Sequence, residues 1–407
     1  MFLKECKKIM HSLVFWVFVV VMAAAYLTQF APELEQRMVE PAKGQESYGT
    51  MVVERPDILM PAAVQSLIGE YLQGYYTAWP MGFYKEIHIK EAERVKMAAV
   101  IEELSGLTRE ELDSFTEYEP CGYVERMDEN GNLVSTYQEA VLPEYVLSEN
   151  VSYERFRELM READELLGGG SKYGEGDLLR NFSQIPMSYE EALAEYRANV
   201  TKEALGGVYG RLYCDYMGIF LAVMPVFAAA AFWDMDRRAK AGALIYSRKA
   251  SSAKIVGMRF AALFCCMMLP VLLTFSHAVF RLNGLYREIG IEWGKAVFLV
   301  ILWLLPSLLF VTAFAILLTE LASPLLAVLI QGLWWFLSLQ ANQVSGSITK
   351  WTLLIRHNML GGSALFQSEW GDFLWNRACY FILAIACVGI EVLVFERKRR
   401  GYRGRGE

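Results

Sequence analysis

Histidine and cysteine are scarce in this chain of 407 residues, and their placement does not favour catalysis. Of the four histidines, His11 and His277 fall in apolar runs, and six of the seven cysteines lie in or beside such runs. Only His88 and Cys121 belong to the long polar segment between residues 31 and 205. No zinc site, nucleophile elbow or intradomain disulfide can be built from this set. The sequence therefore predicts neither an enzyme nor a metal site.

A phosphate-binding loop is also missing. The glycine-rich run "GGGSKYGEG", residues 168–176, has no Lys-Ser/Thr pair after a correctly spaced second glycine, so we interpret it as a flexible loop. No Walker A pattern occurs elsewhere in the chain. We therefore expect no ATP hydrolysis by this chain alone, no cofactor bound to it and no nucleic-acid partner.

Long apolar runs dominate what the sequence does contain. Hydrophobic residues make up 54% of the chain and aromatic residues 13%, more than soluble domains of this length usually carry. A helix crosses the hydrocarbon core of a bilayer with about 20 apolar residues. Six windows qualify, at residues 11–30, 213–233, 260–280, 296–318, 321–339 and 378–395. We predict an α-helical polytopic membrane protein with six transmembrane helices.

Charge is divided unevenly along the chain. Residues 31–205 hold 34 of the 46 acidic and 16 of the 39 basic side chains. With the N-terminus inside, the short inner segments carry 16 bases. The short outer loops carry six, which are Arg281, Arg287, Lys295, Lys350, Arg356 and Arg377. The positive-inside rule then favours an orientation with both termini on the cytoplasmic side of the membrane. The first window has no convincing cleavage site, so we interpret residues 1–30 as an amphipathic helix and a retained span.

Residues 31–210 are then expected to form an extracellular domain between the first two spans. Helix signals recur in it, such as the capping box of Thr108 and Glu111, and Ser188 is placed to cap another helix. Strand-like alternation is limited to short pieces, which predicts a mainly helical α+β domain. Its acidity suits either cationic substrates or simple solubility, and the solubility interpretation is preferred.

Residues 211–407 carry the remaining spans, and prolines interrupt three of them. Pro225, Pro270 and Pro306 each remove a backbone hydrogen bond and would bend a helix. Such kinks serve either a path that opens or static packing, and the sequence leaves both possible. Glu391 lies about one turn from the inner edge, where an interfacial position or a pair with a tail arginine is preferred over a proton relay.

A basic stretch separates the second and third spans. Residues 234–259, "DMDRRAKAGALIYSRKASSAKIVGMR", carry seven Lys or Arg side chains and form a cytoplasmic loop in the predicted topology. The part "GALIYSRKASSAKIVGMRFAAL" resembles the coupling loop of ATP-binding-cassette (ABC) transporter permeases of the type-2 exporter class. The runs "RLYCDYMGIFLAVMPVF" and "YTAWPMGFYK" are similar to a Gram-positive bacterial group of these permeases with a large extracellular domain after the first span.

The resemblance implies a multi-pass permease subunit in a bacterial cytoplasmic membrane that exports a peptide, lipid or drug-like substrate. ATP and Mg would be bound by a separate ATPase subunit. A second copy of the chain, or a related permease, would complete the transporter. The coupling residues would be Gly242, Leu244, Ile245, Tyr246, Ser247, Arg248 and Lys249. The N-terminal helix would add an interfacial surface through Phe2, Leu3, Lys4, Lys7 and Lys8.

Two alternatives stay open at this point. The chain could be a membrane-anchored sensor or binding protein whose extracellular domain recognises a ligand without transport. Each basic cluster could also bind anionic membrane lipid rather than a protein. For the basic tail, residues 396–407, the lipid interpretation is preferred, and for the loop, docking to the ATPase is preferred.

Overall fold

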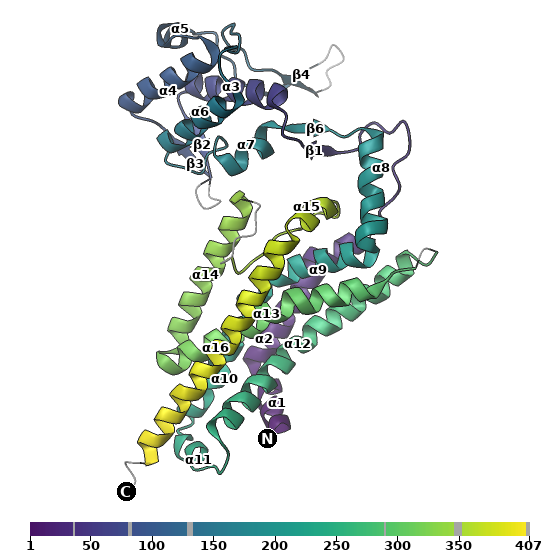
Figure 1. Cartoon of the computed structure of the whole chain (residues 1–407), viewed down its shortest axis with the longest axis vertical. Coiled ribbons are helices and arrows are strands. Elements are labelled where there is room, and N and C mark those ends of the chain that lie inside the picture. The colour runs from purple at the N-terminus through teal and green to yellow at the C-terminus, as the bar shows by residue number, and fades with distance from the viewer. Residues whose placement is uncertain (36, 80–83, 128–132, 289, 346–351, 404–407) are drawn as a thin grey trace. The chain divides into compact units, whose positions relative to one another are not determined.

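The computed structural model describes residues 1–403 apart from 36, 80–83, 128–132, 289 and 346–351 (Figure 1). The chain forms two compact units. One, the helical unit, contains residues 1–45, 189–342 and 346–407. The other, the inserted unit, contains residues 46–188 together with 343–345.

The helices of the helical unit follow the apolar runs of the sequence. In chain order they are α1 (Phe2–Met10), α2 (Leu13–Ala25), the π-helix η1 (Tyr26–Phe30), the 3₁₀-helix η2 (Ala31–Leu34), α8 (Tyr189–Arg197), the π-helix η4 (Ala198–Ala204), α9 (Leu205–Leu221), α10 (Met224–Arg238), α11 (Gly242–Tyr246), α12 (Ser252–Leu285), α13 (Trp293–Leu321), α14 (Pro324–Ser345), α15 (Ser363–Ser368) and α16 (Trp370–Arg403). Helix α8 begins directly after Ser188, as the sequence predicted.

Four helical segments are long and apolar enough to cross a membrane: Leu13–Leu34, Ser252–Leu285, Trp293–Leu321 and Trp370–Gly401. The bent pair Tyr189–Leu221 and Met224–Arg238 makes a fifth if it is counted as one span. The predicted window 321–339 corresponds to a shorter apolar helix, Pro324–Gln340. The described residues thus confirm an α-helical membrane protein with four to five candidate spans, and the count of six stays a prediction.

The bend between α9 and α10 has its origin in one proline. The two helices meet at 43°, and Pro225 lies in the first turn of α10. In a continuous helix, Pro225 would have no N–H for the carbonyl of Leu221, and its ring would clash with that carbonyl. Helix α9 accordingly ends at Leu221. Pro270 and Pro306, by contrast, lie inside the uninterrupted helices α12 and α13.

Side chains of α14 bind carbonyls near this bend. The amide Nε2 of Gln331 donates to the carbonyl of Ala222 at 3.0 Å, and the indole Nε1 of Trp335 donates to the carbonyl of Ile219 at 2.8 Å. Both carbonyls lie where the regular helical pattern is interrupted. In an apolar surrounding, a backbone group without a hydrogen-bond partner destabilises the structure by roughly several kcal/mol. Helix α14 therefore stabilises the bent span.

Helix α13 packs against α9, α10 and α16. Its contact with α9 depends on two glycines spaced four apart. A Cβ at Gly206 would lie 2.1 Å from the carbonyl oxygen of Glu292, and one at Gly210 would lie 2.8 Å from the Cα of Ala296. Neither position leaves room for a side chain, so the small-residue spacing sets how closely α9 and α13 approach.

The inserted unit is mainly helical and has its own apolar core. Its helices are α3 (Pro56–Gln73), α4 (Glu91–Ser105), α5 (Arg109–Ser114), α6 (Tyr153–Leu166) and α7 (Glu175–Phe182). Leu67 of α3, Ile101 of α4 and Phe156 of α6 are fully buried together. The predicted capping box is confirmed, because Thr108 accepts from the Glu111 N–H and the Glu111 side chain accepts from Thr108.

Three antiparallel strand pairs complete the inserted unit. They are β1 (Thr50–Val52) with β6 (Gln184–Pro186), β2 (Tyr76–Ala78) with β3 (Lys85–Ile87), and β4 (Gly122–Met127) with β5 (Leu133–Gln138). In the first pair Met51 lies opposite Ile185. The beginning and the end of the unit are thereby hydrogen-bonded to each other, which is typical of a segment that folds within another domain.

We predict that residues 46–188, expressed alone, form a soluble and cooperatively folded protein. The core of α3, α4 and α6 lies within the segment and the pairing of β1 with β6 closes it. Far-ultraviolet circular dichroism should show a mainly helical spectrum and a single thermal transition. The Leu67→Ala variant should lose about 2–5 kcal/mol of stability. A disordered spectrum for the unmodified fragment would contradict an independent core.

Candidate functional site

The basic stretch, residues 234–259, joins α10 to α12 through the short helix α11 (Figure 1). After α10 ends, Lys240 has a left-handed backbone conformation with φ of 52°. The N–H of Ala241 then bonds to the carbonyl of Asp236 at 2.9 Å and closes the end of α10. Ser251 caps α12 by accepting from the N–H of Lys254 at 3.3 Å. The stretch is therefore ordered at both ends.

The predicted coupling residues face different surroundings. Leu244 is 73% exposed, and Ser247, Arg248 and Lys249 in the following turn are exposed as well. Gly242 is half-buried. Ile245 and Tyr246 are also half-buried and pack against the apolar core of the helical unit, where the Tyr246 ring meets Phe395 of α16 in an edge contact at 5.5 Å. Helix α11 thus presents one apolar side chain outward and anchors itself with two others.

Arg399 of α16 holds the turn that follows α11. Its side chain is only 6% exposed. The guanidinium donates to the carbonyl of Tyr246 at 3.1 Å, to that of Ala250 at 2.7 Å and to that of Arg248. These carbonyls belong to a turn and have no helical partners, so a planar group with several donors suits them. The predicted basic tail therefore contributes to the protein structure through Arg399.

Ion pairs join the basic stretch to its neighbours. Asp234 pairs with Arg237 and Arg238, each at 2.6 Å. Arg259 pairs with Asp236 and lies 3.9 Å from Glu5 of α1. Further contacts are those of Lys398 with Glu320 at 2.7 Å, of the Trp233 indole with Glu320 at 3.0 Å, and of Ser252 with Glu396. The ends of α10, α12, α13 and α16 are linked in one polar cluster.

The predicted interfacial helix packs on α12 as α1. Lys4, Lys7 and Lys8 are exposed and Phe2 is half-buried, whereas Leu3 is 78% exposed. The buried side chains of α1 are Ile9 and Glu5. Helix α1 is therefore held by Ile9 and by the contact of Glu5 with Arg259, and it leaves Leu3 uncovered.

Glu391 of α16 is buried, with 1% of its surface exposed. Neither of its side-chain oxygens has a hydrogen-bond partner among the described residues. The sequence favoured an interfacial carboxylate or a pair with a tail arginine, and among the tail arginines whose side chains the structure describes, none pairs with Glu391.

A second polar cluster was not predicted from the sequence. Arg211 of α9 is 1% exposed and pairs with Glu203 at 2.9 Å. It also donates to the carbonyls of His357, Met359, Leu360 and Gly361, at 2.8 to 3.3 Å. Asp215, one turn further along α9, accepts from Arg356 at 3.0 Å and from the N–H of His357. The segment that precedes α15 is thus fastened to α9.

Arg377 of α16 is also buried and bonds the segment that precedes α15. It is 1% exposed and donates to the hydroxyl of Ser307 at 2.6 Å and to the carbonyls of Trp303 and Leu353. From the sequence we placed Arg377 in an outer loop, whereas it lies inside the apolar helix Trp370–Gly401. A charged side chain inside such a helix marks a candidate functional position.

His357 and Glu369 lie within this second cluster. Burial and the Arg211 guanidinium lower the pKa of His357 to about 4. Its Nε2 lies 3.0 Å from Glu369 Oε2, but the two atoms are not aligned for a hydrogen bond. Burial also raises the pKa of Glu369. Both side chains therefore favour their neutral forms, and burial outweighs the attraction that a charged pair would gain.

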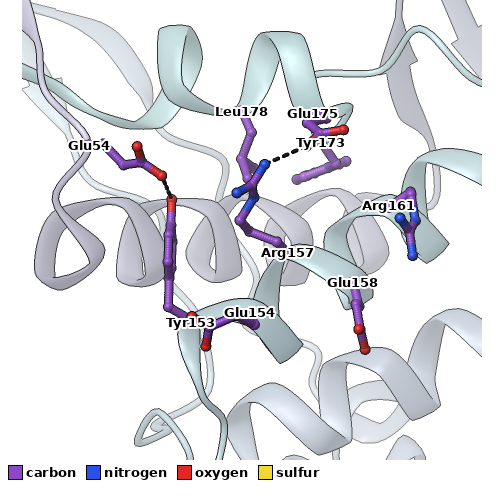
Figure 2. A pocket seen from close by; sticks show the side chains of 9 residues that line it. All are labelled: Glu54, Tyr153, Glu154, Arg157, Glu158, Arg161, Tyr173, Glu175 and Leu178. Carbon is purple, nitrogen blue, oxygen red and sulfur yellow. Dashed lines mark hydrogen bonds and ion pairs between the residues drawn. The ribbon is translucent and has the colours of Figure 1, made fainter.

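The inserted unit carries a polar cavity of its own, of about 440 Å³ (Figure 2). Arg157 points across it toward Glu175, with which it pairs, and the Tyr153 hydroxyl donates to Glu54 at 2.9 Å. Leu178 and Tyr173 line the same space. Two pairs of lining groups thus satisfy each other, and the described lining residues form no nucleophile and base pair.

Within the described part of the chain, no group of three or more His, Cys, Asp or Glu side chains is placed to hold a metal ion. Comparison with protein-family models, with curated proteins and with solved structures gives no match for this chain.

The first prediction from this site concerns Arg399. The Arg399→Gln variant should loosen the turn after α11, because three carbonyls lose a charged donor worth about 1.5–3 kcal/mol per bond. Trypsin should then cleave at Arg248 or Lys249 about tenfold faster in the detergent-solubilised protein. Arg400→Gln is the matched control, since Arg400 is 79% exposed in its side chain and lies one residue away. Equal cleavage rates of the two variants would contradict the role of Arg399 in holding this turn.

The second concerns His357. The unfolded imidazole has a pKa of about 6.5, so between that value and about 4 the unfolded chain binds more protons than the folded one. Stability is therefore lost as pH falls through this window, by about 2 kcal/mol at pH 5. Between pH 7 and pH 5, the melting temperature of the His357→Gln variant should fall less than that of the unmodified protein. The same substitution at the exposed His88 should leave the fall in melting temperature unchanged. An equal fall in all three proteins would contradict a lowered pKa of His357 as its cause.

Proposed function

We propose that the chain is the membrane-spanning permease subunit of an ABC exporter in a bacterial cytoplasmic membrane. A separate ATPase subunit binds ATP and Mg and docks on α11, and a second copy of the chain or a related permease completes the assembly. Both termini and the basic stretch face the cytoplasm in this proposal, and the inserted unit is extracellular. The transported substrate is a peptide, a lipid or a drug-like molecule.

The observation that carries the proposal is the exposure of Leu244 on a firmly held helix. An apolar side chain that is 73% exposed on a five-residue helix gains nothing in the isolated chain. Buried apolar side chains supply most of the binding energy of protein interfaces. Because Arg399, Ile245 and Tyr246 fix α11 to the rest of the unit, a partner bound at Leu244 would act on a defined element.

Helix α16 offers a route from the docking position to the second polar cluster. It runs without interruption from Trp370 to Arg403. Near one end Arg399 bonds the loop of α11, and near the other Arg377 bonds the carbonyls of Trp303 and Leu353. Rigid secondary elements and hydrogen-bond networks can carry coupling between distant sites. This supports a transport role, in which docking at α11 changes the packing around Arg377.

The alternative of a membrane-anchored sensor is supported by the separate fold of the inserted unit and by its polar cavity. A sensor needs neither an exposed apolar side chain at the basic stretch nor a broken span braced by α14. The two proposals therefore differ in whether an ATPase binds at Leu244.

The test is affinity purification of the membrane-inserted full chain from the cells that naturally produce it. We expect an ABC ATPase to co-purify, with Mg-dependent ATP hydrolysis in the preparation. Leu244→Asp should lower the recovered ATPase activity by about thirtyfold or more, as expected for an interface residue that contributes at least about 2 kcal/mol.

Val146→Asp provides the matched control, since Val146 is 80% exposed in the inserted unit and its change should leave recovery unaltered. Full recovery with Leu244→Asp would exclude docking at α11. Absence of any ATPase in the unmodified, correctly inserted preparation would favour the sensor.

A further inference from the structure

A cavity of about 410 Å³ lies beside α11, at the ends of the long helices. Its wall comes from the basic stretch and from the ends of α13 and α16. The lining residues are Trp233, Asp236, Arg237, Lys240, Gly242, Ile245, Tyr246, Arg259, Glu320, Phe395 and Lys398. It therefore combines three aromatic rings with four basic side chains, where the apolar part of the helical unit meets its polar cluster.

The charges around the cavity leave it positive. The acids Asp234, Asp236 and Glu320 are paired with Arg237, Arg238, Arg259 and Lys398. Glu5, which lies 3.9 Å from Arg259, is itself paired with Lys8 at 3.2 Å. Since Asp234 alone serves two arginines, one positive charge stays uncompensated there. Lys240 adds another, because its ammonium makes no ion pair or hydrogen bond with the residues that the structure describes. Two positive charges are thus available to a ligand.

The backbone at Lys240 is a second sign that its side chain has a role. Its φ of 52° falls in the left-handed region, which costs an ordinary residue roughly 1 kcal/mol and usually selects glycine or asparagine at the end of a helix. A lysine at this position weakens the closure of α10. Strained positions of this kind are often found at binding sites.

The surroundings of the cavity suit a molecule with apolar chains. The rings of Trp233, Tyr246 and Phe395 line it, and aromatic side chains of this type concentrate where a membrane meets water. Leu321, which follows the lining residue Glu320, is 59% exposed. Next to it in sequence, α14 leaves Leu325 68% exposed. An acyl chain could therefore continue from the cavity along apolar surface.

We propose that this cavity binds the phosphate of an anionic membrane phospholipid, with Lys240 and Arg237 as the recognising cations. Basic pockets between membrane helices recognise lipid headgroups in this way. A free phosphate ion would use the same cations but would leave the aromatic rings and Leu321 without a function. The inference does not depend on an ATPase partner, since none of its steps uses Leu244.

The test uses the purified full chain in neutral detergent, titrated separately with phosphatidylglycerol, phosphatidylcholine and inorganic phosphate. We expect a saturable rise in melting temperature with phosphatidylglycerol and none with the other two. Lys240→Asn should raise the half-saturating phosphatidylglycerol concentration about fivefold, as expected for one lost base. Asparagine tolerates the left-handed backbone, so this variant keeps the closure of α10.

Lys254→Asn is the matched control, because Lys254 is exposed at the start of α12, carries the same charge and does not line the cavity. It should leave the half-saturating concentration unchanged. An equal effect of both variants would indicate diffuse attraction and overturn the site. An equal response to inorganic phosphate would overturn the lipid assignment, and so would the lack of a saturable response to phosphatidylglycerol. Leu244→Asp should retain the response, which separates this result from the docking proposal.

Discussion

Bonds from buried guanidinium groups to backbone carbonyls hold the irregular segments of the helical unit in place. Arg211 donates to four carbonyls of the segment before α15, and Arg399 donates to three carbonyls of the turn after α11. Irregular backbone cannot satisfy its own carbonyls, and each unsatisfied one is costly in an apolar surrounding. Arginine suits this position because its fork carries several donors and stays charged when buried. Without these side chains, seven carbonyls of the two segments would lose the donors that join them to the long helices.

These bonds belong to two polar clusters of the helical unit, one around Arg399 and one around Arg211. Continuous helices join the two clusters. Between the clusters the interior is apolar, with Trp303 of α13 and Tyr213 of α9 among its largest buried side chains. Close-packed interiors of this kind have few intermediate arrangements, so a shift at one cluster is expected to move whole helices. The interior is thus better suited to concerted motion than to local adjustment.

Much of the helical framework could be predicted from apolar run length, because a membrane-spanning helix must be apolar over most of its length. Helix capping could also be predicted from the sequence, as the capping box of Thr108 and Glu111 shows. The different surroundings of Leu244 and Tyr246 were not predictable, since α11 is too short for a helical period to show which side is covered.

The buried charges were missed for a different reason. An apolar window stops at the first charge, so Arg377 was placed in a loop although α16 begins seven residues earlier, at Trp370. The partners of Arg211 are 146 to 150 residues away in sequence, and no local pattern records such a distance. The spacing of Gly206 and Gly210, which sets the approach of α9 to α13, fits a small-residue motif that we did not use to predict this contact.

The bracing of the bent span has a consequence for biosynthesis. The carbonyl of Ala222 depends on Gln331, which lies 109 residues later in the chain. When α9 and α10 leave the ribosome, their bend has no such donor, and it must wait for α14 to be synthesised. At about 5–20 residues per second this interval lasts roughly 5 to 20 seconds. During that time water or the insertion machinery must satisfy the bend, so α9 and α10 are expected to complete their passage into the lipid only after α14 has followed them.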